Sequence, residues 1–223
     1  MSEPPLIAVI HTSPATVETF GRLLKERVPA CRVMNILDDS ILPQLRENGG
    51  DTDAVLPRWR GYVAVAKERG ARLVLNACSS IGALCAPVER EFGLPVVRVD
   101  SRMAEEAVRR GRRIAVVATL ASTLSPTSDL LEATAAAAQT EIKLERFLVE
   151  GAYEALIGGD QARHDDLVAA TLDREAAVAD VVVLAQASMA RVVPRLAAED
   201  RAKFLTSPPF AVEGVAARLA NFR

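Results

Sequence analysis

A cysteine followed by two serines is the segment of this sequence with the clearest chemical potential. Cys78, Ser79 and Ser80 follow the predicted strand at residues 73–76 and precede a short helical pattern. Backbone N–H groups at such a turn favour anions and lower the pKa of a nearby thiol. The two hydroxyls add donors for a carboxylate or enediolate oxygen. We therefore expect a proton-transferring thiol beside a carboxylate-binding turn; the alternative is that Cys78 is a buried, small apolar residue.

The remaining cysteines and the two histidines are weaker candidates. Cys31 begins a strand and Cys85 lies on the helix after the motif, so both are expected to be structural, with Cys85 packed inward. His11 ends the first strand and is expected to contact substrate, whereas His164, at the polar start of a helix, is expected to be solvated. With no CxxC pair and two histidines, no metal site is expected.

The hydrophobic pattern predicts the scaffold that must position these residues. Short apolar runs alternate with longer segments of helical periodicity. Strands are expected at residues 6–10, 32–37, 73–76, 96–99, 114–118, 142–147, 181–185 and 204–205. Helices are expected at residues 14–27, 53–68, 87–92, 101–109, 126–138, 161–178, 189–198 and 212–221. This alternation predicts an α/β fold with parallel sheets and right-handed crossovers.

An internal repeat divides the chain into two similar halves. Residues 7–12 resemble residues 114–119 at an offset of 107, and residues 74–80 resemble residues 182–188 at an offset of 108. We expect two pseudo-symmetric lobes, each a parallel sheet flanked by helices, formed by residues 1–97 with 208–223 and by residues 98–207. Ligands bind at the carboxyl ends of parallel strands, so the loops after the strands would face an inter-lobe cleft. The alternative is a chance likeness between two strand–loop–helix units.

Composition excludes several classes of protein. The chain has 223 residues, with 27 Lys and Arg against 29 Asp and Glu, and only 4% aromatic residues. This balance disfavours a nucleic-acid partner. Three cysteines, an odd number, argue against a disulfide scaffold. The start of the chain lacks a secretory signal, and no apolar run is long enough to span a membrane, so a cytoplasmic protein with no membrane partner is expected.

Together these features resemble the aspartate/glutamate/hydantoin racemase superfamily, which also includes maleate isomerases and arylmalonate decarboxylases. The resemblance covers nearly the whole chain and is carried by residues 75–80 (LNACSS), 118–123 (ATLAST) and 183–189 (VLAQASM). It implies cofactor-independent proton transfer at the α-carbon of a small carboxylate, with one cysteine from each lobe acting on opposite faces. It also implies a homodimer or a higher homo-oligomer.

The resemblance assigns roles to individual residues and meets one departure. Cys78 occupies the first cysteine position, but the second holds Gln186, whose amide forms hydrogen bonds and exchanges no proton at neutral pH. Cys78 and Gln186 form the expected catalytic pair, in which Gln186 orients the substrate. The expected substrate-binding residues, which follow strands or lie in the matching motifs, are His11, Thr12, Asn76, Ser79, Ser80, Thr119, Thr123 and Ser188.

The missing second thiol leaves the reaction open. Symmetrical two-base racemisation is weakened, while isomerisation, decarboxylation or another one-sided proton transfer stays possible. A non-catalytic, two-lobed carboxylate-binding protein is a further alternative, and an unrelated flavodoxin-like protein is another.

Overall fold

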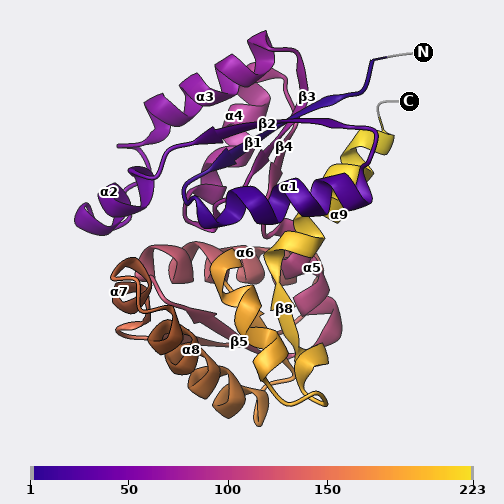
Figure 1. The fold of residues 1–223 in the computed structure, drawn as a ribbon. Coiled ribbons are helices and arrows are strands. Elements are labelled where there is room, and N and C mark those ends of the chain that lie inside the picture. The colour runs from indigo at the N-terminus through magenta and orange to yellow at the C-terminus, as the bar shows by residue number, and fades with distance from the viewer. Residues whose placement is uncertain (1–2, 222–223) are drawn as a thin grey trace. The chain divides into compact units, whose positions relative to one another are not determined.

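Two four-stranded parallel sheets organise the chain in the computed structural model, which describes residues 3–221 (Figure 1). The first contains β1 (Leu6–His11), β2 (Arg32–Leu37), β3 (Ala71–Asn76) and β4 (Val96–Arg98). The second contains β5 (Arg113–Ala118), β6 (Lys143–Leu148), β7 (Val181–Leu184) and β8 (Phe204–Thr206). The strand orders are β2-β1-β3-β4 and β6-β5-β7-β8. The predicted α/β fold with parallel sheets is confirmed.

Helices connect the strands within this framework. The α-helices are α1 (Ala15–Arg27), α2 (Ile41–Glu47), α3 (Leu56–Glu68), α4 (Cys85–Phe92), α5 (Ser101–Arg110), α6 (Ala121–Ala137), α7 (Ala152–Ile157), α8 (Gln161–Ala176) and α9 (Ser207–Ala220). The 3-10 helices are η1 (Ser79–Leu84), η2 (Ala187–Arg195) and η3 (Arg201–Lys203). Within the described range of 3–221, every helix is too short or too polar to cross a membrane.

The chain forms two compact units, each built around one sheet. Unit 1 extends to Ser101 and includes the chain from Pro208 onward, and unit 2 is Arg102–Ser207. The connections after β4 and β8 therefore pass from one unit to the other, so that α9 completes unit 1 although its preceding strand belongs to unit 2.

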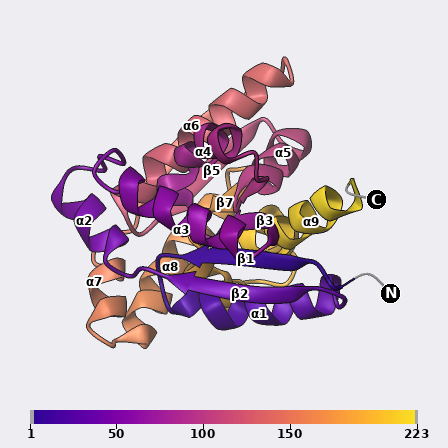
Figure 2. The same cartoon turned by 90° about the horizontal axis from the view of Figure 1, so that it is seen from above.

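Alternation along the strands builds the core of unit 1. Successive side chains point to opposite faces of a sheet. Ile7 and Val9 of β1 pack with buried residues of α1 and α9, whereas Ala8 and Ile10 pack on the other face with α3 and α4. Figures 1 and 2 show these helices on the two sides of the sheet. Because both faces are covered at the centre of the sheet, β1 is apolar from Leu6 to Ile10 rather than alternating with polar residues.

The core of unit 2 follows the same plan. Val117, Val182 and Leu184 from the sheet pack with Val168 and Leu172 of α8 in one buried cluster. All five side chains are fully excluded from solvent. Burial of these aliphatic groups is the main driving force that holds the helix on the sheet.

The structure departs from the predicted elements in several places. The short helices α2 and α7 were not expected, because six or seven residues are too few for a clear helical period. The helix expected at 126–138 begins at Ala121, so Pro126 lies inside it rather than at its start. The helix expected at 189–198 is instead the 3-10 helix η2.

Strand registers bear out the internal repeat. In unit 1, Ile10 pairs with Asn76 across β1 and β3. In unit 2, Val117 pairs with Leu184 across β5 and β7, at offsets of 107 and 108 residues. The N–H group of the residue after each third strand, Ala77 or Ala185, donates to the partner carbonyl. The two units are therefore pseudo-symmetric down to backbone hydrogen bonds.

Candidate active site

Cys78 occupies a fixed position at the carboxyl end of β3. Its backbone is extended, with φ −136° and ψ 117°, and it is the residue immediately before η1. Ser79 and Ser80 form the first turn of η1 and are both buried. The sequence folds this way because β3 is an apolar strand in the middle of its sheet and η1 starts as soon as the strand pairing ends. The predicted strand–turn placement of the thiol is thus what the structure shows.

Four donors converge on the Cys78 thiol. The side chains of Thr12 and Ser80 and the backbone N–H groups of Ser80 and Ile81 all hydrogen-bond to it. Each of these lowers the pKa of the thiol, but burial outweighs them and the net pKa is raised. The expectation that the turn alone would favour the thiolate is therefore wrong, because Cys78 is only 6% exposed and desolvation penalises the charged form.

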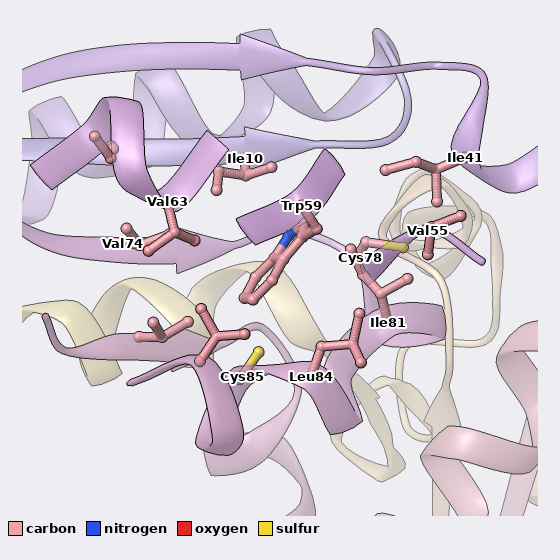
Figure 3. Close-up of a cluster of buried hydrophobic side chains, with 14 of the residues drawn as sticks. Ile10, Ile41, Val55, Trp59, Val63, Val74, Cys78, Ile81, Leu84 and Cys85 are labelled. Carbon is pink, nitrogen blue, oxygen red and sulfur yellow. The ribbon is translucent and has the colours of Figure 1, made fainter. Parts of the chain in front are cut away.

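Apolar side chains form the other wall around the thiol. Cys78 belongs to a buried cluster that includes Ile41, Val55, Trp59 and Ile81. In Figure 3 the sulfur of Cys78 points towards Val55, with Ile81 and Trp59 beside it. Ile41 comes from α2, so this short helix, which the sequence did not reveal, supplies part of the wall. The thiol thus has polar donors on one side and hydrocarbon on the other.

His11 makes both of its ring contacts inside unit 1. The side chain is fully buried, with Nδ1 2.7 Å from Thr16 Oγ1 and Nε2 3.0 Å from Asn35 Oδ1. Burial lowers its pKa, while the hydrogen bond to Asn35 acts in the opposite direction. This geometry makes His11 a brace between the end of β1, the first turn of α1 and β2.

Asn76 also turns inward. Its Nδ2 donates to the backbone carbonyl of Cys78 at 2.9 Å and to the Sγ atom of Cys85 at 3.3 Å. Its Oδ1 is buried without a hydrogen-bond partner. Cys85 is packed inward as expected, and burial raises the pKa of its thiol to about 12. Cys31 is partly buried against the core cluster on the opposite face of the sheet.

Gln186 is the counterpart of Cys78 in unit 2. It precedes η2 with an extended backbone, φ −125° and ψ 135°, and follows β7 as Cys78 follows β3. Its Oε1 accepts the backbone N–H of Thr119 at 2.6 Å and the Thr119 hydroxyl at 2.9 Å. Thr119 is equivalent in the repeat to Thr12, which hydrogen-bonds the Cys78 thiol. The two units thus use the same threonine position to hold different side chains.

The structure thus groups the predicted residues within each unit. Thr12, Cys78 and Ser80 share hydrogen bonds in unit 1, with Ser79 on the same turn. Thr119 and Gln186 share hydrogen bonds in unit 2. Thr123 is buried in the first turn of α6, and Ser188 is half-buried in η2.

His164 corrects one expectation. It is fully buried rather than solvated, and its Nδ1 lies 2.8 Å from Asp165 Oδ1. Arg191 of η2 donates from Nε to the same carboxylate oxygen at 2.9 Å. The helix start is polar in sequence, but Arg191 of η2 contacts it, and a contact between residues 26 positions apart leaves no local signal. His164 Nε2 is buried without a hydrogen-bond partner.

Arg98, which lies against Gly82, and its partner Asp100 are polar residues that the sequence analysis did not single out. Asp100 is fully buried, and Arg98 Nε donates to its Oδ1 at 2.6 Å. The sequence signal that could have found them is a pair of opposite charges, Arg98 and Asp100, at the end of an apolar strand. Among residues 3–221, no three His, Cys, Asp or Glu side chains gather into a group that could hold a metal ion.

Comparisons with known proteins identify the family. The model of the Asp/Glu/hydantoin racemase family matches residues 7–215. A glutamate racemase of Gloeobacter violaceus is 36% identical over 109 residues, which cover 48% of this chain and 40% of that relative. The matched stretch therefore spans about two fifths of the relative's length.

Solved structures agree on the fold. A glutamate racemase from Bacillus anthracis superposes with a TM-score of 0.78 at 15% identity, covering 99% of this chain and 83% of that one. The allantoin racemase from Klebsiella pneumoniae gives a TM-score of 0.68 at 20% identity, covering 97% and 88%. With the family model matching almost the whole chain, this protein belongs to the Asp/Glu/hydantoin racemase family.

Proposed function

We propose that the protein is a cofactor-independent enzyme that moves a proton at the α-carbon of a small carboxylate through Cys78. The observation that carries this proposal is the convergence of four hydrogen-bond donors on one thiol at the end of β3. A thiol that served only as core filler would not need that set of donors. Membership of a racemase family supports the same chemistry.

The proposed step uses the thiol as an acid/base group. In its thiolate form, Cys78 Sγ takes the α-proton and becomes the neutral thiol, and the electron pair of the broken C–H bond delocalises into the carboxylate as an enediolate. Hydroxyl and N–H donors aimed at the developing negative charge stabilise it more than they stabilise the neutral ground state. Ser79 and Ser80 are the proposed donors on this turn, and Thr123 and Ser188 are the proposed donors of unit 2. Thr119 instead holds Gln186, because its N–H and its hydroxyl both donate to Gln186 Oε1. The same thiol returns the proton, which regenerates the free enzyme.

Gln186 favours one-sided chemistry as a second candidate. Its amide can orient a substrate through hydrogen bonds but cannot deliver a proton to the opposite face of the α-carbon. The N–H and hydroxyl groups of Thr119 both donate to Gln186 Oε1, so the amide is held in one orientation and can act as a fixed hydrogen-bonding group. Isomerisation, or decarboxylation followed by protonation from Cys78, needs a single proton carrier and fits this arrangement.

Deuterium incorporation tests the proposal. The protein is incubated in heavy water with amino acids, hydroxy acids, dicarboxylates and hydantoins, and exchange at the α-carbon is followed by NMR. We expect exchange or turnover with at least one of these compounds. Stabilisation of the protein by a carboxylate without any exchange would instead identify a binding protein.

The assembly and cellular setting are also proposals. We propose a homodimer or a higher homo-oligomer in the cytoplasm. Support for a reducing compartment comes from Cys31, Cys78 and Cys85, which are all free thiols. Light scattering at several protein concentrations would measure the assembly directly.

A further inference from the structure

We propose that Arg98 is a positioning residue that holds the turn bearing the catalytic thiol in its reactive form, and that it acts through Gly82. We call residues 78–82 the Cys78 turn. The catalytic consequence rests on the proposed function, whereas the effect on the thiol itself does not.

The carboxylate of Asp100 holds the Arg98 side chain in place. Arg98 is the last residue of β4, where it pairs with Asn76, and its side chain is only 14% exposed. Its Nε and Nη2 donate to the two carboxylate oxygens of Asp100, at 2.6 and 3.2 Å. Two parallel bonds to one carboxylate set the plane of a guanidinium as well as its position. Since Asp100 is fully buried, this plane cannot shift without disturbing a buried charge pair.

The fixed guanidinium lies directly against Gly82. A Cβ atom at Gly82 would sit 2.2 Å from Arg98 Nε and 2.4 Å from Arg98 Cζ, far inside contact distance. The far end of an arginine can usually move away, but here Asp100 holds it. Glycine, which has no Cβ atom, is therefore the one residue type that lets position 82 pack this closely against the guanidinium. By contrast, a Cβ at Gly61 of α3 would meet nothing within 4 Å.

The turn carries the donors that matter for the thiol. The N–H groups of Ser80 and Ile81, two and one residues before Gly82, both hydrogen-bond to Cys78. A turn that rests on a rigid plane keeps those N–H groups aimed at the sulfur. Asn76, the register partner of Arg98, adds a second brace through its bond to the Cys78 carbonyl.

The internal repeat supplies an independent argument. In unit 2 the register position equivalent to Arg98 is Thr206, which pairs with Leu184 as Arg98 pairs with Asn76. At the same offset of 108 residues, the position equivalent to Gly82 is Ala190. The arginine and the glycine thus occur together in the unit that carries the thiol, and both are replaced in the unit that carries Gln186. This pairing is what a shared task in positioning the thiol predicts.

The test measures the pH dependence of Cys78 alkylation by iodoacetamide in the full chain, with fragment mass spectrometry to separate Cys78 from Cys85. The variants are Gly82→Ala, Arg98→Lys and the double variant, and Gly61→Ala is the matched control. Loss of about one N–H donor to the thiolate raises the midpoint by about one pH unit, so that alkylation below the midpoint is about tenfold slower. The double variant should match the single variants, because both changes remove the same support. Gly61→Ala should leave the rate unchanged.

A merely structural role gives a different result. If the changes only loosened the fold, the thiol would become accessible and alkylation would accelerate. Acceleration, or an unmoved midpoint in a folded Arg98→Lys protein, overturns the proposal. Arg98→Lys keeps a cation beside Asp100, so it decides the matter if Gly82→Ala fails to fold by circular dichroism. In a turnover assay, the same variants should lower kcat with little change in KM. A parent protein without turnover would refute the proposed function. The alkylation measurement would still test the positioning role of Arg98 independently.

Discussion

Thr119 donates both its backbone N–H and its hydroxyl to Gln186 Oε1, at 2.6 and 2.9 Å. The equivalent threonine of unit 1, Thr12, hydrogen-bonds the Cys78 thiol. One threonine position therefore holds a titratable group in unit 1 and an amide in unit 2. This relationship explains why the family's chemistry is expected here in a one-sided form.

Restoring a thiol at position 186 should add the missing proton carrier. We expect Gln186→Cys to convert one enantiomer of an exchanged substrate into the other about a hundredfold faster than Gln186→Ser, because serine has the same shape but exchanges no proton as an acid/base group. Chiral chromatography measures the interconversion. Equal rates for the two variants would contradict a proton-transfer role for a thiol at position 186.

Removing the Trp59 side chain should destabilise unit 1 strongly. Trp59 is fully buried in the cluster that contains Cys78 (Figure 3). Truncation to alanine leaves a large cavity and should lower the free energy of unfolding by about 3–5 kcal/mol. Urea unfolding at pH 7 measures this loss. Val65→Ala on the same helix, where the side chain is 46% exposed, should change stability by about 0.5 kcal/mol or less.

Asp38 should make the protein less stable in acid. Burial alone would raise the pKa of Asp38, but hydrogen bonds from Ser40 and Tyr62, together with the nearby Arg58, outweigh it and hold this pKa below its usual value of 3.8. Because the folded state lowers this pKa, the charged carboxylate stabilises the fold above pH 3.8, and that contribution is lost as the pH falls through the folded value. The stability difference between the parent and Asp38→Asn should therefore be constant near neutral pH and shrink below pH 4. Urea midpoints across this range measure it, and a difference independent of pH would contradict the assignment.

The sequence was sufficient for the framework because that information is local. Apolar runs of three to five residues marked β1, β3, β5 and β7, and the repeat placed Cys78 and Gln186 at equivalent strand ends. Helix α2 escaped prediction because seven residues show no clear period, yet it brings Ile41 to the wall around the thiol. Short elements of this kind take their structure from tertiary packing rather than from propensity.

The parts that sequence reasoning missed depend on distance in the chain. Burial of His164 follows from Arg191 closing over it, and the raised pKa of Cys78 follows from the apolar wall outweighing four donors. The contact between Gly82 and Arg98 joins residues 16 positions apart. None of these three features can be predicted from residue types alone, because each depends on which side chains come into contact after folding.

The most direct test of the central claim is the exchange of the α-proton for deuterium by Cys78→Ala and Cys31→Ala proteins, assayed side by side with a compound that the parent exchanges. If Cys78 carries the proton, Cys78→Ala should lose exchange by at least about a hundredfold, and Cys31→Ala should retain the parent rate. Full exchange by a folded Cys78→Ala protein would contradict the assignment of this thiol as the acid/base group.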